Sequence, residues 1–169
     1  GFLVSAPMTI HGGSVRSQSG NAMGVKLSNN SAAVAIYGLD AYLPDSSSNA
    51  IGQYAGLHPV SVQIYDSTLL SGGATLSLSG AGASVMMSGN TMQSLSAQQY
   101  LRASGTGSLV VSDLNEYYVS GGPAPFSLAG TDYSSLSSWT AATGNDGHST
   151  IHAGPYPLTR LLLGSGITI

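Results

Sequence analysis

The chain has 169 residues, of which 42% are hydrophobic and only 7% are charged, against roughly 25% charged residues in average soluble proteins. A core can therefore be built, but the surface must consist mainly of uncharged polar side chains. With four Lys and Arg residues and a net charge of −3, a nucleic-acid partner is not expected. The chain has no run of about 18 apolar residues, which argues against membrane insertion. It has no cysteine, which excludes disulfides and thiolate metal sites.

One short strand pattern recurs five times along the first two thirds of the chain. In each copy the first and third residues are apolar, which is the period-2 pattern of a strand with one buried face. Successive copies begin 26, 28, 23 and 24 residues apart. The copies are Met8–Ile10, Val34–Ile36, Val62–Ile64, Val85–Met87 and Leu109–Val111.

A turn-forming residue follows each copy within four positions, because Gly, Asp and Asn supply a positive φ or bond to their own backbone. These residues are Gly12-Gly13, Gly38 with Asp40, Asp66, Gly89-Asn90, and Asp113 with Asn115. A second apolar pair lies nine residues upstream in two of the copies. These pairs are Val25 with Leu27 and Leu76 with Leu78.

Such a repeat describes the coil of a β-solenoid, and we predict an all-β, right-handed parallel β-helix of about five to six coils. Stacked coils require aliphatic inward columns, and the sequence provides two. The first is Met8, Val34, Val62, Val85 and Leu109, and the second is Ile10, Ile36, Ile64, Met87 and Val111. An antiparallel β-sandwich or jelly roll also has short alternating strands, but it does not predict equivalent residues in the same column. Leucine-rich repeats need regularly spaced Leu and Asn, which are missing.

We expect residues 1–120 to form the stacked coils, and residues 121–169 to add a loop, a short helix and a terminal coil or cap of the same domain. The Gly- and Pro-rich segment Gly121–Pro125 predicts a loop, and Ser149–Ile151 predicts a return to strand. The apolar tail Leu158–Ile169 is predicted to cap or extend the last coil, since an open solenoid end exposes strand edges.

A short helix is predicted inside this C-terminal part. Asp132 would cap it, with Leu136 and Trp139 on one face at a spacing of three residues. Trp139 is the only tryptophan, and we interpret it as a buried anchor for the helix rather than as a sugar platform.

The histidines near the C-terminal end are interpreted as structural or surface residues. His148 and His152 lie four residues apart with Asp146 nearby, a spacing that converges on one metal ion when the segment is a helix. In a strand the same separation spans about 13 Å, so one ion cannot bridge the two imidazoles. No metal or cofactor is therefore expected.

A family resemblance appears in the segment Leu136–Ser149. It is similar to a segment found late in many pectate-lyase-like parallel β-helix proteins, where a short helix with a Trp is followed by Gly-x-Asp-x-x-Ser. That superfamily includes polysaccharide lyases, glycosidases, epimerases, phage tailspikes and non-catalytic surface proteins. The resemblance implies the fold and a bias toward carbohydrate, not a reaction. Because its members are usually much longer, it also implies that this chain is the C-terminal part of a longer solenoid.

The outward column beside the inward isoleucines is the candidate ligand site. It reads His11, Tyr37, Tyr65, Ser88 and Ser112, with Asp66 following on the turn. Adjacent coils would stack Tyr37 on Tyr65 and present them to solvent, where aromatic rings with nearby polar groups can hold a sugar. The alternative is that the aromatic column only stabilises the solenoid surface through cross-strand pairing. We therefore assign His11, Tyr37, Tyr65 and Asp66 as candidate carbohydrate-binding residues.

Candidate catalytic residues are few. Glycosidases need two carboxylates roughly 5–9.5 Å apart, and the candidate pairs are Asp40 with Asp66 and Asp113 with Glu116. The offsets of Asp40 and Asp66 from their strands differ by two residues, and turn aspartates usually cap the backbone. A lyase of the resembling family would need a Lys or Arg base, but no basic residue lies in a matching motif. These basic residues are Arg16, Lys26, Arg102 and Arg160. Enzymatic activity stays open, and we do not expect it from this chain alone.

The sequence favours an extracellular, cell-surface or virion β-helix module that displays a carbohydrate-binding face to a glycan or polysaccharide, because uncharged polar side chains suit neutral sugars. Two alternatives stay open: a part of a polysaccharide lyase or glycoside hydrolase, and a purely architectural filament or virion component. Tailspikes of this fold are trimers, so the resemblance allows a homotrimer or a larger assembly.

Overall fold

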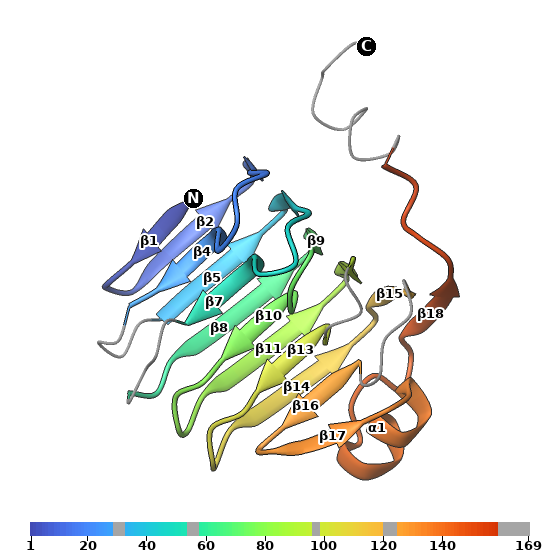
Figure 1. The fold of residues 1–169 in the computed structure, drawn as a ribbon. Coiled ribbons are helices and arrows are strands. Elements are labelled where there is room, and N and C mark those ends of the chain that lie inside the picture. Colours follow the sequence, from blue (N-terminus) through green and yellow to red (C-terminus); the bar gives the residue numbers. More distant parts are fainter. Residues whose placement is uncertain (29–32, 54–57, 96–98, 120–124, 159–169) are drawn as a thin grey trace.

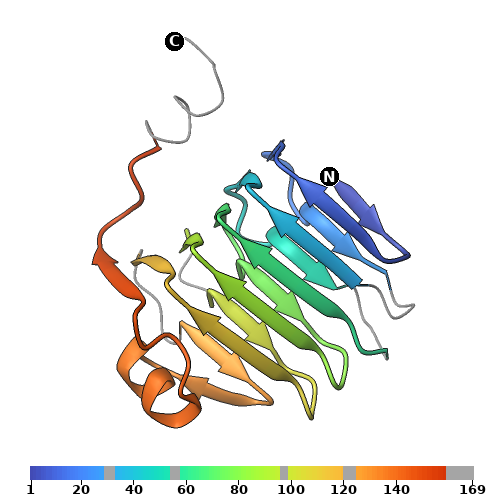
Figure 2. The ribbon, with the colours of Figure 1, turned by 180° about the vertical axis from the view of Figure 1, so that it is seen from behind.

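The computed structural model describes residues 1–28, 33–53, 58–95, 99–119 and 125–158. The chain winds into a parallel β-solenoid whose strands form three sheets along one axis (Figure 1; Figure 2). This confirms the predicted solenoid and rules out a sandwich, because every strand pairs in parallel with its neighbours except β16 with β17 among the described residues. The structure has about four turns, fewer than the five to six expected.

Each coil contributes one strand to each sheet in turn. Sheet A contains β1 (Phe2–Val4), β4 (Met23–Leu27), β7 (Asn49–Gln53), β10 (Leu76–Leu78), β13 (Leu101–Ala103), β16 (Phe126–Leu128) and β17 (Thr131–Tyr133). Sheet B contains β2 (Met8–His11), β5 (Ala33–Tyr37), β8 (Ser61–Tyr65), β11 (Ser84–Ser88) and β14 (Leu109–Asp113). Sheet C contains β3 (Ser14–Arg16), β6 (Asp40–Leu43), β9 (Thr68–Ser71), β12 (Thr91–Ser94), β15 (Glu116–Val119) and β18 (Thr150–Ala153).

The five recurring segments are the strands of sheet B. Their register stacks one inward column of Val34, Val62 and Val85 and a second of Ile10, Ile36, Ile64 and Met87. These side chains are buried in one continuous core, which stacking of apolar faces stabilises. Met8 continues the first column but is 40% exposed, because its strand lies at the end of the sheet.

The predicted register of the fifth copy is wrong by one residue. Val110 and Ser112 pair with the inward residues of β11, so Leu109 and Val111 point outward and are 70% and 60% exposed. The inward Ser112 is accommodated because its hydroxyl donates to the buried carboxylate of Asp146 at 2.9 Å. Burying a serine costs little free energy when its hydroxyl is hydrogen-bonded. The strand can therefore adopt this register although the alternation of apolar residues predicts the other one.

The turn from sheet B to sheet C has a left-handed residue in every coil. The φ angles are 65° at Gly12, 66° at Gly38, 50° at Asp66, 69° at Gly89 and 59° at Leu114. The predicted turn positions are thus confirmed, with Leu114 as the unexpected member. The buried residues that follow form a polar ladder along the axis. Asn90 Oδ1 accepts from the Ser67 N–H at 3.0 Å, and Asn115 Oδ1 accepts from the Asn90 N–H at 3.0 Å.

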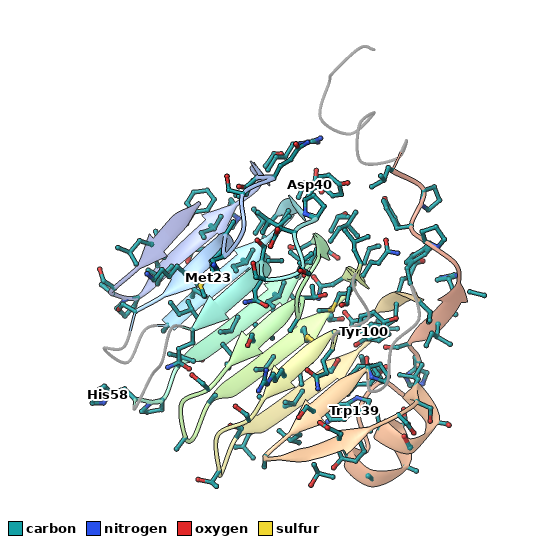
Figure 3. The ribbon with its side chains drawn as sticks, viewed as in Figure 1. Met23, Asp40, His58, Tyr100 and Trp139 are labelled. Atoms are coloured by element: carbon teal, nitrogen blue, oxygen red, sulfur yellow. The ribbon has the colours of Figure 1, made fainter. Side chains whose placement is uncertain are left out.

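The C-terminal end is closed by β17 and by α1 (Leu136–Thr143). The helix begins after Ser135, whose hydroxyl accepts from the Ser138 N–H at 3.0 Å. Asp132 therefore does not cap it as predicted: Asp132 belongs to β17, and the Ser135–Ser138 capping box satisfies the helix start instead. Trp139 is buried as predicted and stacks on Phe126 with centroids 5.0 Å apart and planes 9° apart (Figure 3).

The end of the described chain returns over sheet C. The strand predicted near Ser149–Ile151 is confirmed as β18. The Tyr156 N–H then donates to Gln93 Oε1 on β12 at 3.1 Å, and the Tyr156 ring packs edge-on against Tyr118 of β15. This segment therefore covers part of the outer face of sheet C. Most of the predicted loop 121–125 and tail 158–169 lies outside the described residues. No helix in the described part of the chain is long and apolar enough to span a membrane.

Candidate functional site

Three aromatic side chains stack on the outer face of sheet B. His11, Tyr37 and Tyr65 occupy the same position of β2, β5 and β8 and are brought together by the parallel register. The His11 and Tyr37 rings are 5.0 Å apart with planes 10° apart, and the Tyr37 and Tyr65 rings are 5.2 Å apart with planes 19° apart. The aromatic part of the column predicted from the sequence is therefore present, and Tyr37 is 37% exposed.

The stack limits which ring surfaces a ligand can reach. Nearly parallel rings cover each other's facing sides, so Tyr37 mainly offers its edge and hydroxyl to solvent. Tyr65 ends the stack, since within the described residues no ring lies against its other face. Its hydroxyl donates to Met86 Sδ of the next coil at 2.9 Å.

A shallow depression of about 290 Å³ lies on the same sheet, two residues along the strands from the aromatic stack. Its lining includes Thr9, Ala35 and Gln63, which precede the three stacked aromatic residues by two positions. Because side chains two apart in a strand share a face, the depression and the stack form one outer surface. The lining carries no charged side chain. It comprises Pro7, Met8, Thr9, Ala33, Val34, Ala35, Ser61 and Gln63.

The aromatic column continues into a polar pair. Ser88 follows Tyr65, and Asp113, rather than the predicted Ser112, occupies the next position. The Asp113 carboxylate accepts from the His148 backbone N–H at 2.8 Å and lies 2.7 Å from its Nδ1. The His148 hydrogen bonds lower the pKa of Asp113, and the same contact raises the pKa of His148. The side chains are 40% and 78% exposed, so water screens this pair.

The candidate catalytic carboxylates occupy different positions along the coils. Asp40 pairs with Thr68 of the next coil, which lies two residues after Asp66. Asp40 and Asp66 are therefore not equivalent positions, as their different distances from the preceding strands suggested. Asp66 lies instead on the exposed left-handed turn between sheets B and C. Glu116 contacts its own neighbours on sheet C. Its Oε2 is 3.9 Å from His152 Nε2 and accepts from the Tyr118 hydroxyl at 3.4 Å.

No metal site is formed by the described residues, where no group of three His, Cys, Asp or Glu side chains converges. His148 lies in the turn before β18 and His152 lies within β18, and they contact separate carboxylates, those of Asp113 and Glu116.

The sequence interpretation missed the role of Asp146. This carboxylate is 2% exposed and accepts from five side chains. The donors are Ser112 Oγ at 2.9 Å, Asn115 Nδ2 at 3.2 Å, Tyr117 OH at 3.0 Å, Trp139 Nε1 at 2.8 Å and Ser149 Oγ at 2.6 Å. Burial, and then the Asp146 charge, raise the pKa of Tyr117, so its hydroxyl stays protonated and donates. The network joins the C-terminal cap to the solenoid; its sequence signal is the Trp before Gly-x-Asp-x-x-Ser.

Comparisons with protein-family models, with curated proteins and with solved structures found no match.

Proposed function

We propose that this chain is a structural module of the extracellular or virion surface whose sheet B outer face binds a neutral glycan. The observation that carries the proposal is the solvent-facing stack of His11, Tyr37 and Tyr65 beside an uncharged depression on the same strands. Aromatic carbon and uncharged hydrogen-bonding groups are the two chemistries that sugar rings need.

The polar groups of this surface suit hydroxyl ligands. Thr9 and Ser61 provide hydroxyls, and Gln63 provides an amide that can both donate and accept. From Ala33 to Tyr37 the strand covers about 13 Å, long enough for more than one sugar ring. An oligosaccharide lying along β5 would therefore contact the depression and the aromatic edges together.

Composition and resemblance support the same ligand class. Only 7% of the residues are charged, which suits a surface that binds without ion pairs. The Leu136–Ser149 segment resembles one found in pectate-lyase-like β-helix proteins, many of which act on or bind polysaccharides. The same resemblance implies a homotrimer, because tailspikes of this fold are trimers. The oligomeric state of this chain is therefore a further quantity to measure.

A glycan array of the purified chain tests the proposal, with reducing-end release assayed on every hit. We expect binding to neutral oligosaccharides without release. Tyr37→Ala should remove binding, whereas Tyr42→Ala, the same change on sheet C, should leave it unchanged. Thermal melting of both variants checks folding. Equal binding by Tyr37→Ala and the wild type would contradict the proposed face, and release of reducing ends would make the chain an enzyme.

A subunit contact is the second candidate function, and one observation favours it. Met86, Leu109 and Val111 are apolar, exposed and adjacent on the outer face of sheet B, toward the C-terminal end of the column. Contiguous exposed apolar side chains often mark an interface. If the module is only architectural, Val111→Asp should dissociate an oligomer seen by light scattering, and no glycan should bind.

A further inference from the structure

The outer column of sheet B changes its chemistry at Ser88. The register places Tyr65, Ser88 and Asp113 in direct succession on β8, β11 and β14. Neighbouring strands lie about 4.8 Å apart, so roughly 9.6 Å separates the backbone positions of Tyr65 and Asp113. The register position between them is held by the small Ser88 side chain, and Met86 lies two residues before it on the same strand. Stacked rings keep centroid distances of about 4.5–7 Å, so the gap has room for one additional ring.

The N-terminal side of this gap is apolar. Tyr65 turns toward it the ring face that is not covered by Tyr37. The Tyr65 hydroxyl donates to Met86 Sδ, and Met86 is 42% exposed beside the ring. A flat aliphatic ring face would find aromatic carbon here without any rearrangement of the stack.

The C-terminal side of the gap accepts hydrogen bonds. His148 engages one oxygen of Asp113 with its backbone N–H and the other with its ring, which holds the carboxylate in place. A carboxylate has about four lone-pair sites, so this carboxylate can accept further bonds from a ligand. Asp66 provides a second acceptor beside the gap. Its Oδ1 lies close to Gly89, the residue after Ser88, because a Cβ atom built on Gly89 would be only 2.5 Å from it.

We infer that one pyranose ring of the glycan binds over Ser88, with its C–H face on Tyr65 and its hydroxyls donating to Asp113 and Asp66. This inference rests on the proposed function and deepens it by fixing the position and charge class of one sugar. The two carboxylates favour a neutral sugar and disfavour uronic and sialic acids, since like charges repel at such distances.

Filling the gap with a protein ring tests the inference. Ser88→Tyr extends the aromatic column by one residue and should occupy the place of the sugar, without lowering the melting temperature, because cross-strand aromatic pairs stabilise sheets. Calorimetric titration with the neutral hexose oligosaccharides bound on the array should show a dissociation constant raised about tenfold or more. Thr91→Tyr, which adds a tyrosine on sheet C instead, should keep the wild-type affinity.

The results separate this inference from the proposed function. Loss of binding in both Tyr37→Ala and Ser88→Tyr supports both, whereas loss in Tyr37→Ala with full affinity in Ser88→Tyr overturns the position over Ser88 alone. Absence of neutral-glycan binding by the wild-type chain overturns both. A second variant tests the charge: Asp113→Asn should improve binding of a matched uronic-acid oligosaccharide relative to the neutral one. An unchanged ratio would remove Asp113 from the site.

Discussion

Trp139 donates its indole N–H to Asp146 Oδ2 across 2.8 Å, and both residues are almost completely buried. The other oxygen of Asp146 accepts from Ser149 Oγ at 2.6 Å. Gly144 ends the helix between them with a φ of 74°, and Asp146 itself has a φ of 57°. The Trp and the Gly-x-Asp-x-x-Ser segment thus have a structural meaning: they attach the helical cap to the last coil.

Asp146→Asn should destabilise the chain by about 2–4 kcal/mol, because several buried donors lose a charged acceptor. Asn keeps the shape of the side chain and tolerates the left-handed backbone, but it removes the charge and replaces one acceptor oxygen with an NH2 donor. Urea unfolding measures the difference. Asp132→Asn, on the exposed strand β17, is the matched control and should change stability by less than about 0.5 kcal/mol. Equal stability of the two variants would show that the network does not hold the cap.

Trp139 stabilises the fold through its ring stack on Phe126 and through its hydrogen bond to Asp146, and two variants separate these contributions. Trp139→Phe keeps the stack on Phe126 but loses the donor to Asp146, so we expect a loss of about 1.5–3 kcal/mol. Trp139→Ala removes the ring as well and should cost about 3–5 kcal/mol or more. Chemical unfolding of both variants provides the comparison. A Phe variant as unstable as the Ala variant would indicate that the ring in the cap contributes little without its N–H.

The stacked fold and the aromatic column could be predicted because both follow from repetition alone. Aliphatic residues at equal offsets must meet when coils stack, and the side chains beside them must then meet on the outside, as Tyr37 and Tyr65 do. The fifth copy failed this reasoning. Leu109 and Val111 continue the apolar pattern, but the structure turns them outward and buries Ser112.

The reason for that failure also explains why Asp146 was missed. The carboxylate that accepts a hydrogen bond from the inward Ser112 lies far along the chain. Asp146 is 34 residues after Ser112, 31 after Asn115 and 29 after Tyr117. Hydropathy patterns measure only the local sequence, whereas a buried polar network is decided by such distant partners. The pairing of Asp113 with His148, 35 residues apart, was unpredictable for the same reason.

We expect Leu114 to destabilise the turn between sheets B and C. Its φ is 59° and its side chain is 61% exposed, whereas three of the other four residues in this column are glycine. The left-handed conformation costs a branched residue about 1–2 kcal/mol, and glycine loses about 0.5–1 kcal/mol through unfolded-chain entropy. Leu114→Gly should therefore raise the free energy of unfolding by about 0.5–1 kcal/mol.

Denaturant titration with a matched variant checks this prediction. Leu109→Gly changes another exposed leucine, but in a strand where the backbone is extended, and it should lower stability by about 0.5–1 kcal/mol. The opposite signs at Leu109 and Leu114 are the test. A loss of stability at both positions would mean that the Leu114 side chain contributes more through packing than its backbone conformation costs.

The pair of Asp113 and His148 predicts a pH dependence with a definite window. Hydrogen bonds from His148 hold the pKa of Asp113 below its ordinary 3.8, so this contribution is present above 3.8 and is lost as the pH falls through the lowered value. The same carboxylate holds the pKa of His148 above its ordinary 6.5, so that contribution is complete below 6.5 and is lost as the pH rises through the raised value. Both contributions are present together between 3.8 and 6.5.

We therefore expect the difference in melting temperature between the wild type and His148→Ala to be largest between pH 3.8 and 6.5 and to shrink on either side. The difference should be small and should decrease with added salt, because both side chains are exposed. His58→Ala, at an exposed turn, is the matched control and should show no such maximum (Figure 3). A stabilisation by His148 that instead grows as the pH rises well above 6.5 would show that its contact with Asp113 does not depend on the imidazolium charge.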